Sequence, residues 1–147
     1  MIKIAAAALF ACASASALAD DRGMNVVASP FDMDHTVLRV ESALREKGVK
    51  IFAIVDHAEE ARAAGMDLPP TKLLIVGNPK AGTPLMQRDQ AVGIDLPLKL
   101  LIWRTPSGEV DVGWNSPEYL AKRHALPDGF ERPLGALGGI VSQALRP

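Results

Sequence analysis

The stretch that decides the fold is Leu98–Trp114, with the sequence LKLLIWRTPSGEVDVGW. Its middle, Thr105–Gly108, has proline at the second position and glycine at the fourth, which is typical of a type I turn. The flanking segments, 98–104 and 109–114, are rich in the branched and aromatic residues that favour strands. We therefore predict a β-hairpin, and a hairpin makes this pair of strands antiparallel.

Alternation along the two predicted strands gives the hairpin two different faces. On the first strand, one face carries Leu98, Leu100 and Ile102, and the other carries Lys99, Leu101 and Trp103. On the second strand, one face carries Val110, Val112 and Trp114, and the other carries Glu109, Asp111 and Asn115. If the apolar sets pair, the opposite face is mixed, which suits a ligand cleft or a subunit contact. The alternative is an outer face with Lys99 paired to Asp111 and Trp103 under a loop.

Short strands and helices alternate along the rest of the chain. We predict further strands at 24–29, 49–55 and 71–76, and helices at 33–47, 57–64, 117–124 and 133–145, with another helix capped by Thr83 and beginning at Pro84. Together with the hairpin, these elements predict an α+β two-layer sandwich, with a mainly antiparallel sheet and helices packed on one face. A small parallel α/β sheet is the alternative.

Composition and charge narrow the class of protein. The chain has 147 residues, of which 48% are hydrophobic and 22% charged, so it can bury the core of one domain. Its net charge of −1 argues against a broad surface for nucleic acid, and it has no internal run long enough for a membrane span. A single cysteine excludes an internal disulfide framework and a cysteine-rich zinc site.

The first 19 residues have the pattern of a secretory signal peptide. Lys3 supplies a positive charge, residues 4–13 an apolar segment, and Ala17–Ala19 the small residues that precede cleavage. Cleavage after Ala19 leaves one domain, 20–147, without a cysteine, which fits the periplasm or secretion. Two alternatives stay open: a lipoprotein anchored through Cys12, and an N-terminal core helix.

Several short motifs are similar to those of the bacterial domain of unknown function 302 family. They are Leu73–Pro79, Gly82–Met86, Gly93–Lys99, the pattern Gly48, Phe52, Asp56-His57 and Ala61, and the downstream Gly108, Val110, Val112, Ser116-Pro117 and Tyr119-Leu120. The resemblance covers about residues 24–125 and leaves the segment 126–147 outside the family pattern. It implies a compact α+β fold like that of the TATA-binding protein, together with export and a homodimer. It implies no activity, cofactor or catalytic residue.

Gly77–Thr83 is the first candidate site, because it follows a predicted strand and precedes a predicted helix. It imitates a phosphate-binding loop but lacks the lysine required after the second glycine. A weak anion site at the helix start is one interpretation. The alternative is a tight turn in which Asn78 bonds the backbone and Gly82 takes a positive φ.

Histidines offer a second kind of site. His57 beside Asp56 could act as an oriented base in a small periplasmic enzyme. His35, His57 and His124, with Met86, could hold a metal or haem, although their spacing matches no ligand motif. Our leading hypothesis is instead a non-enzymatic domain that binds a small ligand or a protein partner. Its candidate binding residues are Asn78, Lys99, Trp103, His57 and Asp95.

Overall fold

The computed structural model describes residues 22–130 and 132–147. The predicted signal peptide, its cleavage site and Cys12 lie outside the described residues. The strands are β1 (Met24–Ser29), β2 (Lys50–Asp56), β3 (Thr71–Gly77), β4 (Leu98–Arg104) and β5 (Val110–Asn115). They form one sheet in the order β1-β5-β4-β3-β2, and all four pairings are antiparallel. The predicted α+β sandwich is therefore confirmed, and the parallel alternative is wrong.

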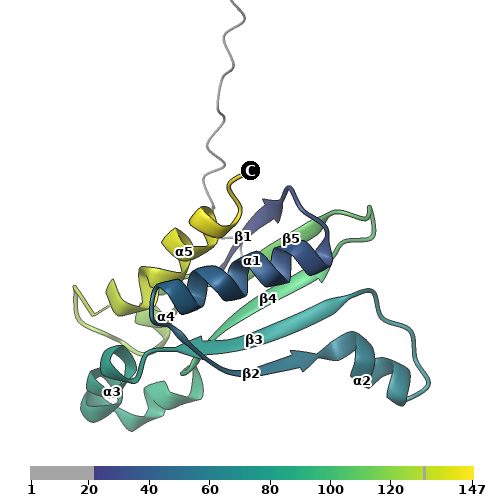
Figure 1. Ribbon diagram of the computed structural model, residues 1–147. Coiled ribbons are helices and arrows are strands. Elements are labelled where there is room, and N and C mark those ends of the chain that lie inside the picture. The colour runs from purple at the N-terminus through teal and green to yellow at the C-terminus, as the bar shows by residue number, and fades with distance from the viewer. Residues whose placement is uncertain (1–21, 131) are drawn as a thin grey trace, which may run out of the picture.

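Two helices cover one face of this sheet, α1 (Met33–Glu46) and α5 (Ala136–Ala144) (Figure 1). α1 begins where the Asp32 side chain accepts a hydrogen bond from the His35 amide, and its Val40 and Leu44 are fully buried. They pack against the buried face of the hairpin, which consists of Leu100, Ile102, Val110, Val112 and Trp114. The predicted faces of the hairpin are thus confirmed.

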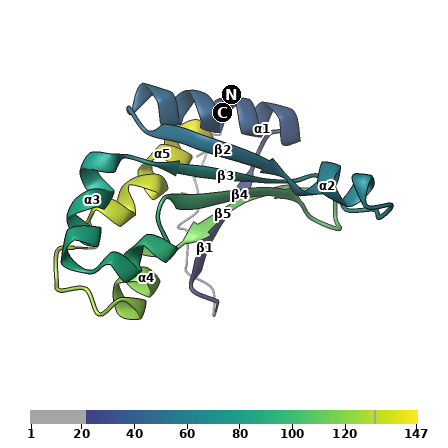
Figure 2. The same ribbon diagram turned by 90° about the horizontal axis from the view of Figure 1, so that it is seen from below.

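The remaining elements gather at the two ends of the strands (Figure 2). At one end lie α3 (Pro79–Arg88), the short 3₁₀ segments η1 (Gln90–Ile94) and η2 (Arg132–Gly135), and α4 (Pro117–Arg123). At the other end lie α2 (His57–Ala63) and the hairpin turn. Figure 2 shows no helix over the middle of the second sheet face. None of the helices within 22–130 and 132–147 is long and apolar enough to cross a membrane.

The start of α3 corrects one prediction. Asn78, not Thr83, caps the helix, with Pro79 at its first position, so Pro84 lies inside the helix and Gly82 has no positive φ. Asn-Pro and Thr-Pro are equally good start signals, and the earlier one prevails because the Asn78 side chain accepts from the Lys80 amide at 2.9 Å. Pro84 costs the helix one backbone hydrogen bond without ending it.

The C-terminal segment belongs to the core of the domain. Leu137, Ile140, Val141 and Ala144 of α5 are buried in the same cluster as the sheet residues. A Cβ atom at Gly138 would lie 3.6 Å from Trp114 Cζ2, so the absence of a side chain brings α5 close to the sheet. The helix predicted at 133–145 is thus present over Ala136–Ala144 and packs against the sheet.

Candidate functional site

A pocket of about 320 Å³ opens at the end of the sheet where α3 begins. Its walls come from β2, the β3–α3 loop, α3, the segment leading into β4, and η2. They consist of Phe52, Gly77, Asn78, Pro79, Ala81, Gly82, Thr83, Leu85, Met86, Leu96, Pro97, Leu98, Pro133 and Leu134. Only Asn78 and Thr83 among them carry polar side chains. Such a lining, with few polar groups, is typical of small-molecule sites.

Glycines keep this pocket open. A Cβ atom at Gly77 would lie 3.4 Å from Pro97 Cβ and 3.7 Å from the Phe52 ring, and one at Gly82 would lie 3.4 Å from Leu96 Cδ1. These are ordinary contact distances, so larger side chains at these positions would occupy the cavity before they strained the backbone. Phe52 lies at the register shift of β2 between Ile51 and Ala53, and its side chain lines the pocket.

Three lysines, Lys47, Lys50 and Lys80, belong to segments that neighbour the pocket lining. Lys50 Nζ lies 4.6 Å from the centroid of the Phe52 ring, a cation–π contact. Lys80 lies between two lining residues in the first turn of α3, and Lys47 lines an adjoining cavity that shares Gly77 and Asn78. Within the part of the chain that the structure describes, no carboxylate pairs with any of these three lysines.

The predicted binding residue Asn78 lies in the pocket wall. Its side-chain oxygen accepts from the Lys80 amide, which leaves the side-chain NH₂ without a hydrogen bond to any described residue. That NH₂ group can therefore donate to a bound molecule.

Lys99 and Trp103 lie on the second face of the sheet and not in the pocket. Lys99 Nζ donates to the Ile94 carbonyl at 3.2 Å. Trp103 covers Gly113, where a Cβ atom would lie 3.0 Å from the indole ring. Strand register places Trp103, not Lys99, beside Asp111, so the alternative pairing of Lys99 with Asp111 does not occur within one chain.

The predicted binding residue Asp95 does not line the pocket but contacts the end of α4. Its carboxylate lies 2.6 Å from His124 Nε2 and 3.2 Å from Arg123 Nε, and the His124 and Asp95 side chains are only 8% and 12% exposed. These contacts tie the loop before β4 to the end of α4. Asp95 therefore positions the neighbouring Leu96 and Pro97, which line the pocket.

His57 begins α2 and lies far from the pocket. It follows the end of β2 at which Asp56 pairs with Lys72, whereas the pocket residue Gly77 pairs with Lys50 at the other end of β2. Asp56 caps α2 through the Glu59 amide and forms an ion pair with Lys72 at 2.8 Å, and both contacts lower the pKa of its carboxyl group. Asn78 follows the opposite end of β3, about 20 Å from His57 at the usual strand rise. The candidate base His57 and the pocket residue Asn78 are thus not brought together.

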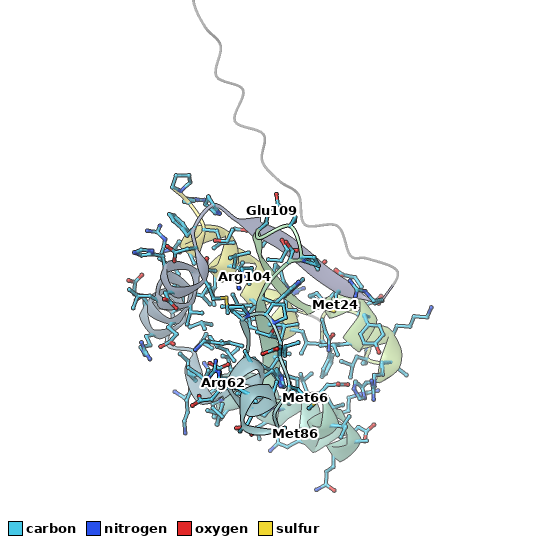
Figure 3. The ribbon with its side chains drawn as sticks, turned by 90° about the vertical axis from the view of Figure 1, so that its right-hand side faces the viewer. Met24, Arg62, Met66, Met86, Arg104 and Glu109 are labelled. Atoms are coloured by element: carbon cyan, nitrogen blue, oxygen red, sulfur yellow. The ribbon has the colours of Figure 1, made fainter. Side chains whose placement is uncertain are left out.

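A second cavity, with polar walls, opens at the hairpin end of the sheet. Arg62 of α2 and Arg104 of β4, both labelled in Figure 3, line it together with Asp32, Asp34, Asp56 and Lys72. Acidic and basic side chains are balanced there, and the pair between Asp56 and Lys72 occupies part of its wall. Among the described residues, no group of three or more histidine, cysteine or acidic side chains is arranged to hold a metal ion.

Comparison with known proteins assigns the family. The model for the domain of unknown function DUF302 matches residues 25–144. The chain belongs to the DUF302 family. The match extends through α5, beyond the range of 24–125 expected from the motifs, and so includes the C-terminal helix in the domain.

Solved and curated relatives agree with this assignment. The crystal structure of an uncharacterized conserved DUF302 protein from Bacillus stearothermophilus superimposes with a TM-score of 0.72 at 21% identity, and the alignment covers 84% of this chain and 95% of that one. Proteins named fluoride-specific ion channel FluC 1, from Brucella suis and Brucella abortus, are 42% identical over 106 residues, which is 72% of this chain. The chain spans only 42% and 39% of the length of these two relatives.

The motifs that carried the DUF302 resemblance converge on the pocket. Gly77–Pro79, Gly82–Met86 and Leu96–Leu98 each supply part of its wall. Sequence reasoning singled out the first two as a loop but missed the partners that complete the cavity, Phe52 and Pro133-Leu134. In the sequence, only its place in the family pattern marked Phe52 as a residue of interest.

Proposed function

We propose that this DUF302 domain binds a small amphipathic anion, with its apolar part in the pocket and its charged group among the neighbouring lysines Lys47, Lys50 and Lys80. The observation that carries the proposal is a preformed apolar pocket of about 320 Å³ whose neighbouring lysines lack carboxylate partners among the described residues. Burial of an apolar body supplies the free energy of binding, and the lysines favour an anionic head over a neutral one.

The size and chemistry of the pocket exclude some ligands. A pocket of this volume lies at the small end of ligand sites, so it accommodates a medium-chain carboxylate or an aromatic acid rather than a nucleotide. Asn78 can add one hydrogen bond from its free NH₂ group. The start of α3 adds little, because Pro79 has no amide proton, the Lys80 amide bonds Asn78 Oδ1 and the Ala81 amide bonds the Asn78 carbonyl.

Calorimetric titration with decanoate and with decanol tests this proposal. Decanoate should bind more tightly than decanol, and the combined change Lys50→Gln and Lys80→Gln should reduce that preference by about two- to fivefold per charge, because exposed ion pairs are weak. Equal binding of acid and alcohol would contradict the anionic head, and binding of neither would contradict the pocket.

Gly82→Leu supplies the variant that blocks the pocket, since its side chain extends toward Leu96. Gly139→Leu is the matched control, because this glycine is also helical and a Cβ atom there meets nothing within 4 Å. Gly82→Leu should abolish decanoate binding while Gly139→Leu leaves it unchanged. An unaffected Gly82→Leu protein would show that the ligand binds elsewhere.

We also propose that the domain works outside the cytoplasm, as a periplasmic or secreted protein. The support is the leader pattern with Ala17–Ala19 before two aspartates, and the lack of cysteine in 20–147. The mass of the protein recovered after export should correspond to 20–147. An added lipid on Cys12 would show a lipoprotein instead, and an uncleaved cytoplasmic chain would contradict export.

A second candidate function rests on the names of the Brucella relatives. Because a region 42% identical to this chain occurs in proteins named fluoride-specific ion channels, the domain could assist such a channel. Expression together with a fluoride channel, in a bacterium that lacks its own, should then raise fluoride tolerance above that given by the channel alone. Equal tolerance would contradict this second candidate.

A further inference from the structure

The cavity at the hairpin end of the sheet, which we call the polar cavity, has a volume of about 500 Å³ and lies between α1, α2 and the hairpin. Strand alternation continues the core-facing rows of side chains into charged groups at this end. On β3 the row of Leu74 continues to Lys72, and on β4 the row of Ile102 continues to Arg104. Asp56 of β2 pairs in register with Lys72 and joins the same row. The apolar core beneath α1 therefore gives way here to a charged cavity.

Two of the three acids in the wall of the polar cavity already have partners for both oxygens. Asp56 accepts a hydrogen bond from the Glu59 amide at 3.1 Å through Oδ1 and pairs with Lys72 at 2.8 Å through Oδ2. Asp32 accepts from the His35 amide at 2.9 Å through Oδ1, and its Oδ2 lies 2.8 Å from His35 Nδ1. These two carboxylates and Lys72 are thus satisfied by the domain itself.

Three other charged groups of the cavity have no such partner. Among the described residues, none forms an ion pair with Arg62, Arg104 or Asp34. Arg62 comes from α2, Arg104 from the end of β4 and Asp34 from the first turn of α1, so three elements each contribute one group (Figure 3 labels the two arginines). The charges left to a ligand are therefore two positive and one negative.

We propose that the polar cavity binds a dicarboxylic α-amino acid of the glutamate class. Its two carboxylates pair with Arg62 and Arg104, and its ammonium group pairs with Asp34. Guanidinium groups suit this task because they bind carboxylates through paired hydrogen bonds. A simple anion such as phosphate would satisfy the arginines but would leave Asp34 unpaired beside it, and a diamine would leave both arginines unpaired. Only a ligand with two acidic groups and one basic group complements all three side chains.

The walls of the polar cavity are held in place by contacts that need no ligand. Asp56 caps α2 and pairs with Lys72 of β3, so one carboxylate fixes the helix that carries Arg62 against the sheet. The Arg104 amide donates to the carbonyl of Pro70, another lining residue, at 2.9 Å. Such preorganisation lowers the cost of binding. The volume of about 500 Å³ is within the range of small-molecule sites.

Three related compounds test the charge pattern on the unaltered protein. In calorimetric titration, glutamate should bind most tightly, and glutarate and glutamine should each bind about fivefold more weakly. Glutarate lacks the ammonium group and glutamine lacks the second carboxylate. Glutarate binding as tightly as glutamate would overturn the role of Asp34, and glutamine doing so would overturn the role of the second arginine. No binding of glutamate would overturn the whole proposal.

Variants test whether glutamate occupies the polar cavity. Asp34→Asn should remove the preference for glutamate over glutarate. One of Arg62→Gln and Arg104→Gln should remove the preference for glutamate over glutamine, and the other should weaken both ligands alike, because it faces the α-carboxylate that they share. Arg45→Gln is the matched control, since this exposed arginine of α1 lies outside the cavity, and it should leave all affinities unchanged. Cavity variants that bind like the control would overturn the proposal.

A competition experiment separates this site from the apolar pocket at the other end of the strands. Excess decanoate should leave the affinity for glutamate unchanged, because the two cavities share no lining residue. Competition between them would place glutamate in the apolar pocket and overturn the proposal. The titrations with glutamate alone do not depend on whether decanoate binds, so this inference and the proposed function can fail separately.

Discussion

Asp95 and His124 meet at 2.6 Å, in a contact that is mostly shielded from solvent. It joins the loop before β4 to the end of α4, although the two residues are 29 positions apart in the sequence. Leu96 and Pro97 follow Asp95 directly and line the pocket, so this contact fixes one pocket wall.

Removal of the Asp95 carboxylate should therefore destabilise the domain. We expect Asp95→Ala to lower the free energy of unfolding by about 2 kcal/mol, since hydrogen bonds to charged groups contribute that much and His124 loses its partner. Arg123→Met is the matched control, because this second partner of Asp95 is 46% exposed and should contribute less than about 1 kcal/mol. Urea unfolding measures both, and equal losses would contradict the role given to the buried contact.

Asp56 should make stability depend on pH at the acid end. Its pKa is lowered below the ordinary 3.8 by Lys72 and by the Glu59 amide, so its stabilisation is present above that value and lost as the pH falls through the folded pKa. Asp56→Ala should cost about 1 kcal/mol at neutral pH, as loss of a helix cap does, and progressively less below pH 4. A cost that stays constant with pH would contradict this assignment.

Asp111 should affect stability in the opposite way. Because its folded pKa is raised, the protonated form favours folding, and this benefit is present below 3.8 and lost as the pH rises through the folded pKa. Asp111→Asn should then stabilise the protein at neutral pH by about 0.5 kcal/mol, within the range of surface changes. Urea denaturation at neutral pH measures this change, and a destabilised variant would contradict the prediction.

The C-terminal helix should be essential for folding. Leu137→Ala should cost about 2–5 kcal/mol, the usual range for a buried leucine. Ser142→Ala, on the exposed side of α5, should change stability by less than about 0.5 kcal/mol. Thermal unfolding compares them, and a mild effect of the Leu137 change would mean that α5 packs less closely than the structure shows.

The hairpin and its two faces could be predicted because both are local. The turn residues 105–108 determine the connection, and the alternation along β4 determines which side is buried. The start of α3 could not be predicted with the same ease, because Asn78-Pro79 and Thr83-Pro84 are equivalent start signals. The helix begins at the earlier of the two, where the Asn78 side chain accepts a hydrogen bond from the Lys80 amide.

The pocket and the contact of Asp95 with His124 depend on segments far apart in the sequence. Phe52, Leu85, Leu96 and Leu134 look like ordinary core residues one by one, and only the fold shows that they leave a cavity. Asp95 was recognised as a candidate, but its partner lies at the end of a different helix. Periodicity and capping signals contain no information on such contacts.

Chemical-shift mapping with decanoate shows directly whether the pocket is the binding site. If the pocket binds amphipathic anions, the amide signals that move should be those of Gly77, Gly82, Met86 and Leu96, with saturation at one ligand per chain. Shifts confined to residues outside the pocket, or no shifts at all, would contradict the proposed function.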